Sequence, residues 1–262
     1  MSEPSLPLHR MQPLQRFSDR AEEYVKYRPN YPGEAIDVIL ADLRADLGNP
    51  DHLVAADIGA GTGIASRLLA ERGVRVWAIE PNDAMRQRAT VVPAMTLLPG
   101  SAEATNLATG SVDLVTCFQA FHWFAPDHCL PEFHRILKSG GRLAVVWNNR
   151  DRSDPFTQGY SEIVKRLSQQ HPAEQRMAAI DPLRESDRFW NLQEHQFPYH
   201  QAMDLAGLIG RAESVSYIPK DAETRQQLVA ALEALYQRWA DAAGQVHLVY
   251  STQVFLAQPT PG

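Results

Sequence analysis

Three glycines within five positions, Gly59, Gly61 and Gly63, separate a short apolar run from a segment with helical spacing. Glycine lets the backbone turn tightly and lets a ligand approach without a Cβ in the way. The next apolar run ends in Glu80, about twenty positions further along. A carboxylate at that place can accept hydrogen bonds from both hydroxyls of a ribose. Residues 54–81 therefore predict a site for a ligand that contains a nucleoside.

The spacing of the glycines distinguishes between two kinds of nucleoside ligand. Dinucleotide-binding enzymes usually carry GxGxxG, which places a pyrophosphate at the N-terminus of a helix. Here the third glycine comes one residue earlier, and Asp57 stands just before the loop. A carboxylate there repels a pyrophosphate and attracts an ammonium or sulfonium group. The pattern favours S-adenosylmethionine, which has both cations and no phosphate, over a nicotinamide dinucleotide.

Apolar runs alternate with helical segments along most of the chain. We expect strands at residues 52–58, 74–79, 95–98, 112–118, 142–147 and 246–257. We expect helices at residues 19–27, 34–47, 64–72, 82–89, 131–137, 156–170 and 224–243. Strands of nearly continuous apolar character are typical of a parallel sheet that is covered on both faces. With right-handed crossovers, the pattern predicts an α/β, Rossmann-like, doubly wound and mostly parallel sheet.

Charge and composition argue against several partners. The 25 Lys and Arg residues against 31 Asp and Glu give a net charge of −6, so nucleic acid is not an expected partner. No stretch approaches the about 20 apolar residues that span a bilayer, and the start of the chain lacks a secretory signal. Cys117 and Cys129 have no metal-site spacing and read as buried free thiols, which suits a cytoplasmic protein. The sequence makes no prediction about oligomeric state.

These motifs together resemble the class I S-adenosylmethionine-dependent methyltransferases. The glycine loop looks like the first motif of that family, and Glu80 matches the acidic residue of its second strand. Residues 100–103 look like the adenine-binding turn after the third strand. Residues 111–124 and 132–149 look like the fourth strand, its helix and the fifth strand. The resemblance implies a methyltransferase with S-adenosylmethionine as the methyl donor and a small molecule as the acceptor.

The opening residues 16–32 are similar to a subgroup that includes trans-aconitate-type methyltransferases and many uncharacterised proteins with a type 11 domain. Small carboxylic acids are therefore the expected acceptors. We expect four parts: an N-terminal arm and capping helix (1–33), the donor-binding core (34–150), a mainly helical acceptor-site region or lid (151–245), and the final strand with its tail (246–262).

The resemblance also implies which residues bind the donor. The loop should hold the methionine part, Glu80 the ribose, and the Ala102 N–H group the adenine, with Ser101 at a position where the family often has Asp. Glu103 is equally well explained as a charge at a helix start. The expected donor-binding residues are Asp57, Gly59, Ala60, Gly61, Gly63, Glu80, Pro81, Ser101, Ala102, Glu103, Phe118, Gln119, Tyr24 and Arg28.

Residues around the expected ends of the fourth and fifth strands are candidates for the acceptor site. His122 is the candidate catalytic residue, as a polariser or a general base, and Trp123 is the candidate wall of the pocket; both can also be packing residues. Tyr31 and Asn149 complete the candidate substrate contacts, although Asn149 fits a plain loop position equally well. A carboxylate acceptor would need no base, whereas a hydroxyl or a carbon acid would need one.

Three other functions compete with this interpretation. Enzymes that methylate base amines usually carry [Asp/Asn]-Pro-Pro-[Tyr/Phe] after the fourth strand, where this chain has Cys-Phe-Gln-Ala at 117–120, and it has no Pro-Cys dipeptide for cytosine chemistry. A protein that binds the donor without turnover, and a nicotinamide-dependent oxidoreductase, remain as alternatives that ligand binding distinguishes.

Overall fold

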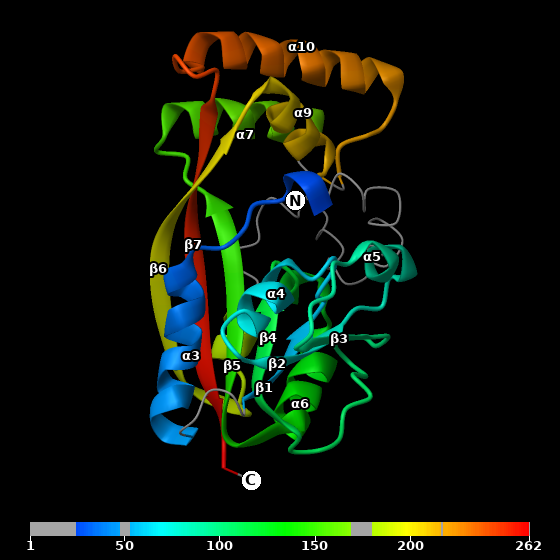
Figure 1. Ribbon diagram of the computed structural model, residues 1–262, viewed down its shortest axis with the longest axis vertical. Coiled ribbons are helices and arrows are strands. Elements are labelled where there is room, and N and C mark those ends of the chain that lie inside the picture. Colours follow the sequence, from blue (N-terminus) through cyan, green and yellow to red (C-terminus); the bar gives the residue numbers. More distant parts are fainter. Residues whose placement is uncertain (1–24, 48–52, 169–179, 216, 262) are drawn as a thin grey trace, which may run out of the picture.

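The computed structural model describes residues 25–47, 53–168, 180–215 and 217–261, and these form a seven-stranded sheet flanked by helices (Figure 1). The strands are β1 (Val54–Ile58), β2 (Arg75–Ile79), β3 (Met95–Leu98), β4 (Val112–Phe118), β5 (Leu137–Arg150), β6 (Phe189–Met203) and β7 (Val246–Pro259). The helices are α3 (Gly33–Leu47), α4 (Ile64–Ala70), α5 (Asp83–Arg88), η4 (Phe121–Trp123), α6 (Pro126–Ile136), α7 (Pro155–Leu167), α8 (Asp181–Arg184), α9 (Leu205–Glu213) and α10 (Ala222–Trp239).

The strand order is β3-β2-β1-β4-β5-β7-β6. Strands β1 to β5 pair in parallel, whereas β7 runs antiparallel to both β5 and β6. The order reverses between β1 and β4, and in open α/β sheets the ligand crevice lies beyond the carboxyl ends of the strands at this point. The expected α/β, doubly wound and mostly parallel fold is confirmed, and β3 and β4 have the predicted bounds.

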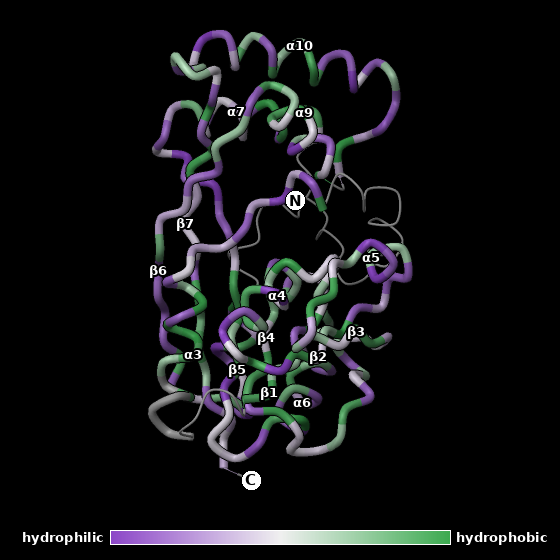
Figure 2. Tube along the Cα trace, in the orientation of Figure 1, coloured by the Kyte–Doolittle hydropathy of each residue, from purple (hydrophilic) through white to green (hydrophobic). Residues whose placement is uncertain are grey.

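Two apolar layers enclose the parallel part of the sheet. Side chains alternate between faces along a strand, so Leu114 packs with α3 and α4 while Val115 packs with α6. Both cysteines are buried free thiols, as the sequence predicts. Figure 2 shows β1 and β4 as predominantly apolar, which fits strands that are buried on both faces.

A third apolar cluster lies at the far end of the long strands. Strands β5, β6 and β7 extend beyond β4, and α7, α9 and α10 pack over that extension at the top of Figure 1. Its fully buried members include Tyr160 on α7, Leu208 on α9, Leu232 on α10 and Leu248 on β7. The helical part of the chain thus has its own core, placed above the crevice end of the sheet.

Strand β6 was not expected from the sequence, because residues 151–245 read as mainly helical. Its residues alternate between half-buried and exposed, and Figure 2 shows much of the strand as hydrophilic. Pro198 lies within it, which an edge strand tolerates since one side of its backbone has no partner strand. An edge position thus explains why β6 carries no apolar pattern.

Several predicted helix ends also differ from the structure. The helix expected from Pro131 begins at Pro126, which occupies the first turn, and Pro131 lies inside α6. Of the helix expected at residues 19–27, the structure describes only residues 25–27, which are helical, and Tyr24 lies outside the described residues. No helix in the described part of the chain is long and apolar enough to cross a membrane.

Candidate active site

The glycine loop turns sharply between β1 and α4. The φ angles are +69° at Gly59, +58° at Gly61 and +78° at Gly63, a region that favours glycine. A Cβ at Gly59 would lie 2.8 Å from the Cβ of Ala120, and one at Gly63 would lie 2.6 Å from Cε of Met95. Backbone conformation thus favours glycine at both positions, and lack of space adds to this at Gly59, whereas at Gly63 the close atom is the end of a flexible side chain.

Glu80 connects the end of β2 to this loop. One carboxylate oxygen accepts a hydrogen bond from the Gly61 N–H group and the other from the Asn82 N–H group, each at 2.8 Å. Burial raises the pKa of Glu80, and these two N–H groups oppose that shift. A carboxylate has about four acceptor positions, so both oxygens keep capacity for a ligand.

Asp57 lies beneath the loop and is almost fully buried. Its two oxygens accept hydrogen bonds from the Ser66 hydroxyl at 2.5 Å and the Thr116 hydroxyl at 2.9 Å. Burial raises the pKa of Asp57 to about 6, although both hydroxyls oppose the shift. The side chain joins β1, α4 and β4 at the point where the sheet order reverses.

The turn at residues 100–104 follows β3. The Ser101 hydroxyl accepts a hydrogen bond from the Ala104 N–H group at 3.2 Å, and Ala102 is buried in the same apolar cluster as Ile79. Glu103 accepts a hydrogen bond from the Ala125 N–H group at 3.2 Å, at the start of α6. No helix begins at Glu103 in the described part of the chain, so its contact is with the start of α6, and its role in donor binding stays a prediction.

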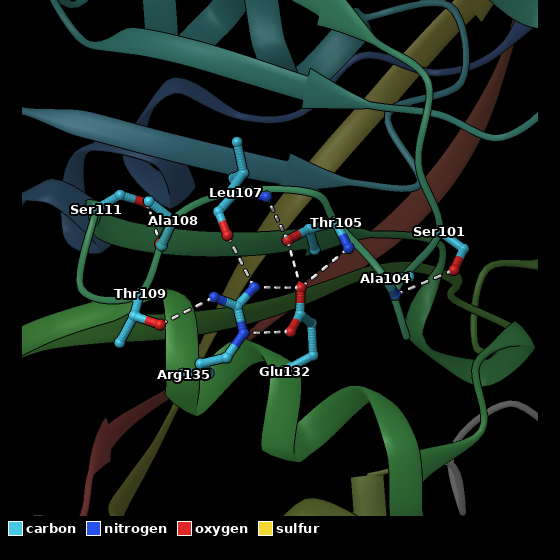
Figure 3. A network of polar contacts seen from close by, with 9 residues as sticks. All are labelled: Ser101, Ala104, Thr105, Leu107, Ala108, Thr109, Ser111, Glu132 and Arg135. Carbon is cyan, nitrogen blue, oxygen red and sulfur yellow. Dashed lines mark hydrogen bonds and ion pairs between the residues drawn. The ribbon is translucent and has the colours of Figure 1, made fainter.

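A polar network fastens the segment after this turn to α6 (Figure 3). Glu132 accepts hydrogen bonds from the N–H group and the hydroxyl of Thr105, at 2.9 and 2.5 Å, and pairs with Arg135 at 2.7 Å. Burial of Glu132 opposes ionisation, but the hydrogen bonds from Arg135 and Thr105 lower its pKa to about 2. This pair was not predicted from the sequence, where its one local signal is the opposite charges three residues apart on a helix.

The end of β4 contacts the segment that leads into α3. The Phe118 ring meets the Tyr31 ring edge to face, with centroids 4.8 Å apart. Gln119 follows with φ at +55°, uncommon for a residue other than glycine, and its amide donates to the Asn148 carbonyl at 3.0 Å. The Asn148 amide in turn donates to the Asn30 carbonyl at 2.9 Å. Three candidate residues, Phe118, Gln119 and Tyr31, are therefore held at the crevice, with Asn148 as their connection.

His122 is buried in η4, and its ring lies 5.1 Å from that of Trp123. The Trp147 indole donates a hydrogen bond to Nδ1 of His122 at 3.2 Å. An indole N–H can only donate, so Nδ1 carries no proton and the neutral ring carries its proton on Nε2. While this bond is kept, His122 can donate a hydrogen bond but has no nitrogen available to take a proton.

Two expected contact residues are bound elsewhere. Arg28 donates to the Ser214 carbonyl at 3.1 Å, at the end of α9, and Asn149 donates to the Gln253 side chain at 2.7 Å. Pro81 lies beside Glu80 and precedes Asn82, whose side chain caps α5. The crevice thus brings together the loop, Glu80 and the end of β4, whereas Arg28 and Asn149 join the strands and helices above it.

A sheet of this order, with a glycine loop after β1 and a buried carboxylate after β2, defines a Rossmann-like nucleoside-binding protein. Residues 56–145 match the family described as "Methyltransferase domain". An uncharacterized methyltransferase of Mycobacterium tuberculosis is 34% identical over 84% of each chain, and an uncharacterized methyltransferase-like protein of Schizosaccharomyces pombe is 29% identical over 95% of this chain and 97% of its own. A solved structure of a candidate type II methyltransferase from Anaeromyxobacter dehalogenans superposes with a TM-score of 0.65 at 24% identity, covering 88% of this chain and 98% of that one.

The chain therefore belongs to the class I S-adenosylmethionine-dependent methyltransferases, and S-adenosylmethionine is its cofactor. The residues present fit that cofactor. The loop leaves no room for a Cβ at Gly59, and two buried carboxylates, Asp57 and Glu80, stand in a crevice that would repel a pyrophosphate. Among the residues that the structure describes, no three His, Cys, Asp or Glu side chains gather as metal ligands would.

The affinity for S-adenosylmethionine is expected to depend on pH through Asp57. The ionised carboxylate attracts a cationic ligand, so the affinity should be constant well above pH 6 and fall below it, by up to about tenfold per pH unit. Because the folded-state pKa of Asp57 is raised, its contribution to the stability of the free protein has the opposite sign: it is present below about pH 4 and is lost as the pH rises through 6.

Calorimetry between pH 5 and 8 measures this effect. Asp57→Asn should flatten the profile, whereas Asp113→Asn should keep it, because Asp113 is buried at the opposite end of the sheet and pairs with Lys138 at 2.9 Å. An Asp57→Asn profile as steep as that of the wild type would assign the titration to another group.

Proposed function

We propose that this methyltransferase transfers the methyl group to a carboxylate of a small molecule, as in the trans-aconitate-type subgroup whose opening segment it resembles. The observation that carries the proposal is the hydrogen bond from Trp147 to Nδ1 of His122. It leaves the candidate base of the crevice without an accepting nitrogen. Such a site suits an acceptor that is already ionised, since a carboxylate needs no proton removed before it attacks.

In this proposal, different residues of the crevice bind the methionine, ribose and adenine parts of the donor. The loop from Gly59 to Gly63, with Ala60 and Asp57, holds the methionine part. Glu80 accepts from the ribose hydroxyls, with Pro81 beside it. The turn with Ser101 and Ala102 binds the adenine, and the Glu132–Arg135 pair keeps that turn in place through Thr105.

The chemistry asked of the protein is mainly orientation. The donor, when bound, would supply an electrophilic methyl group on a sulfonium, with neutral S-adenosylhomocysteine as the leaving group. Water is excluded from the path of methyl transfer by three aromatic side chains, those of Phe118, Tyr31 and Trp123. Gln119 is fixed by its hydrogen bond to Asn148. Alignment of two reactants can supply roughly 7–11 kcal/mol of the barrier without covalent help from the protein.

The proposed role of His122 is to donate a hydrogen bond to the acceptor from Nε2. His122→Ala is therefore expected to leave the affinity for S-adenosylhomocysteine within about twofold while the rate of methyl transfer falls by about ten- to a hundredfold. Calorimetry and a radiolabelled-donor assay measure the two effects separately. A loss of donor affinity as large as that of Glu80→Ala would contradict the assignment.

The acceptor class is tested by a screen with radiolabelled donor against small carboxylates, phenols and amines. Methylation of carboxylates, at a rate that does not rise with pH above 7, supports the proposal. Transfer to phenols or amines alone would overturn it. A protein that binds the donor but turns over no acceptor across the panel would favour the non-catalytic alternative.

A further inference from the structure

The core above the crevice contains a buried arginine. Arg211 on α9 is only 6% exposed. Its Nε donates to the Tyr250 hydroxyl and its Nη1 to the Ser214 hydroxyl, both at 3.3 Å, longer than a typical hydrogen bond. Within the described residues, no carboxylate pairs with it. A guanidinium has five N–H donors and remains charged in proteins, so this positive charge is buried among neutral partners.

The groups around Arg211 are phenols and a second arginine. Tyr160 on α7 is fully buried, and its hydroxyl has no hydrogen-bond partner among the residues that the structure describes. The guanidinium of Arg150 lies 5.4 Å from the centre of the Tyr160 ring. The Tyr250 hydroxyl donates to the Gln201 side chain at 3.3 Å. The positive charges of Arg211 and Arg150 both act on Tyr160, whose hydroxyl has a hydrogen to donate.

The register of the long strands connects this cluster to the crevice. Tyr250 pairs with Arg150, and Thr252 pairs with Asn148, so these side chains lie on one face of β5 and β7. The Thr252 hydroxyl donates to the Asn148 side chain at 2.6 Å, and the Asn148 carbonyl accepts from Gln119. Arg150 and Tyr250 in this cluster are therefore two residues along their strands from Asn148 and Thr252, and Asn148 holds Gln119 at the end of β4.

A buried guanidinium without a counter-charge destabilises the fold unless an anion joins it. Although burial alone would lower the pKa of Arg211, the nearby Tyr250 and Tyr160 raise it, so the group stays charged. A carboxylate accepts two parallel hydrogen bonds from a guanidinium and a further one from a phenol. The missing partner of this cluster is thus an anion of that shape.

We propose that Arg211 and Tyr160 form a subsite that binds a carboxylate of the methyl acceptor, an inference that rests on the proposed function. The subsite recognises the acceptor and takes no part in the transfer itself. Its occupant is a second anionic group of the acceptor, distinct from the carboxylate that receives the methyl group. The donor, which also carries a carboxylate, is the other source of the same chemistry, and the experiment separates the two.

The experiment measures binding to the full chain saturated with S-adenosylhomocysteine. The probes are mono- and dicarboxylates of two to six carbons, each compared with its amide. Arg211→Met and Tyr160→Phe are expected to weaken carboxylate binding by at least about tenfold and threefold respectively, and to leave the affinity for S-adenosylhomocysteine unchanged. Tyr160→Phe removes a hydroxyl that makes no hydrogen bond within the described part of the chain, so it should fold even if Arg211→Met does not.

The matched control is Arg142→Met. Arg142 is equally buried at the other end of β5, where its guanidinium donates to the carbonyls of Gly140 and Gly141. The Arg142→Met substitution should lower the melting temperature and keep carboxylate binding. Arg211→Met should not lower the melting temperature of the free protein. The subsite is overturned if Arg211→Met still binds carboxylates, or if the wild type does not bind them. It is also overturned if Arg211→Met or Tyr160→Phe loses affinity for S-adenosylhomocysteine. Methyl transfer restricted to uncharged acceptors would overturn the subsite and leave the methyltransferase in place.

Discussion

Replacing Glu80 with alanine is expected to weaken the binding of S-adenosylhomocysteine by about two orders of magnitude. A hydrogen bond to a charged group contributes about 1.5–3 kcal/mol, and the ribose offers two hydroxyls to this carboxylate. The substitution also releases the Gly61 and Asn82 N–H groups, which Glu80 now holds on either side of the crevice. The loss therefore combines a removed ligand contact with a less rigid loop. Calorimetry at pH 7.5 measures it directly.

Glu103→Ala is the matched control for this prediction. Glu103 is a carboxylate of the same crevice region, but it is exposed and its one hydrogen bond in the described structure goes to the Ala125 N–H group. Its removal should change the affinity by less than about threefold. If Glu80→Ala and the wild type bound S-adenosylhomocysteine equally well, and melting curves showed both proteins to be folded, the nucleoside would not bind in this crevice.

The sequence predicts best the elements whose signal is local. Strands β3 and β4 are short apolar runs that end at turn residues, and they were predicted with their observed bounds. The glycine loop and Glu80 are also local, because each follows directly from the strand before it. Strand β6 has no such signal, since its stability comes from thirteen paired positions with β7 and hardly from its own apolar residues.

The parts of the site that the sequence did not predict depend on pairing between distant residues. Asn148 contacts Asn30 across 118 positions, and Arg211 contacts Tyr250 across 39. Neither pair has a spacing that periodicity can detect, because the contacts arise only when β5, β6 and β7 align. His122 was correctly placed near the end of β4, but its tautomer depends on Trp147, one strand away.

The largest effect on the fold is expected from Gly59→Ala. The alanine would adopt a φ near +69°, which costs about 1–2 kcal/mol for any residue with a Cβ. Its Cβ would also lie 2.8 Å from the Cβ of Ala120 and 3.1 Å from the Phe124 ring, which forces the loop to move. Such overpacking typically costs a further 1–3 kcal/mol. The free energy of unfolding should therefore fall by about 2–5 kcal/mol, and donor binding should be lost as the loop shifts.

Gly110→Ala separates the two causes. Gly110 has a φ of +60°, close to that of Gly59, but a Cβ there would meet no atom within 4 Å. The same substitution thus imposes the same backbone strain without the steric contact, and it should cost only about 1–2 kcal/mol and leave donor affinity unchanged. Denaturant unfolding of both variants measures the difference. If both lost the same stability and both still bound S-adenosylhomocysteine, the close approach of the loop to the end of β4 would have no role in forming the site.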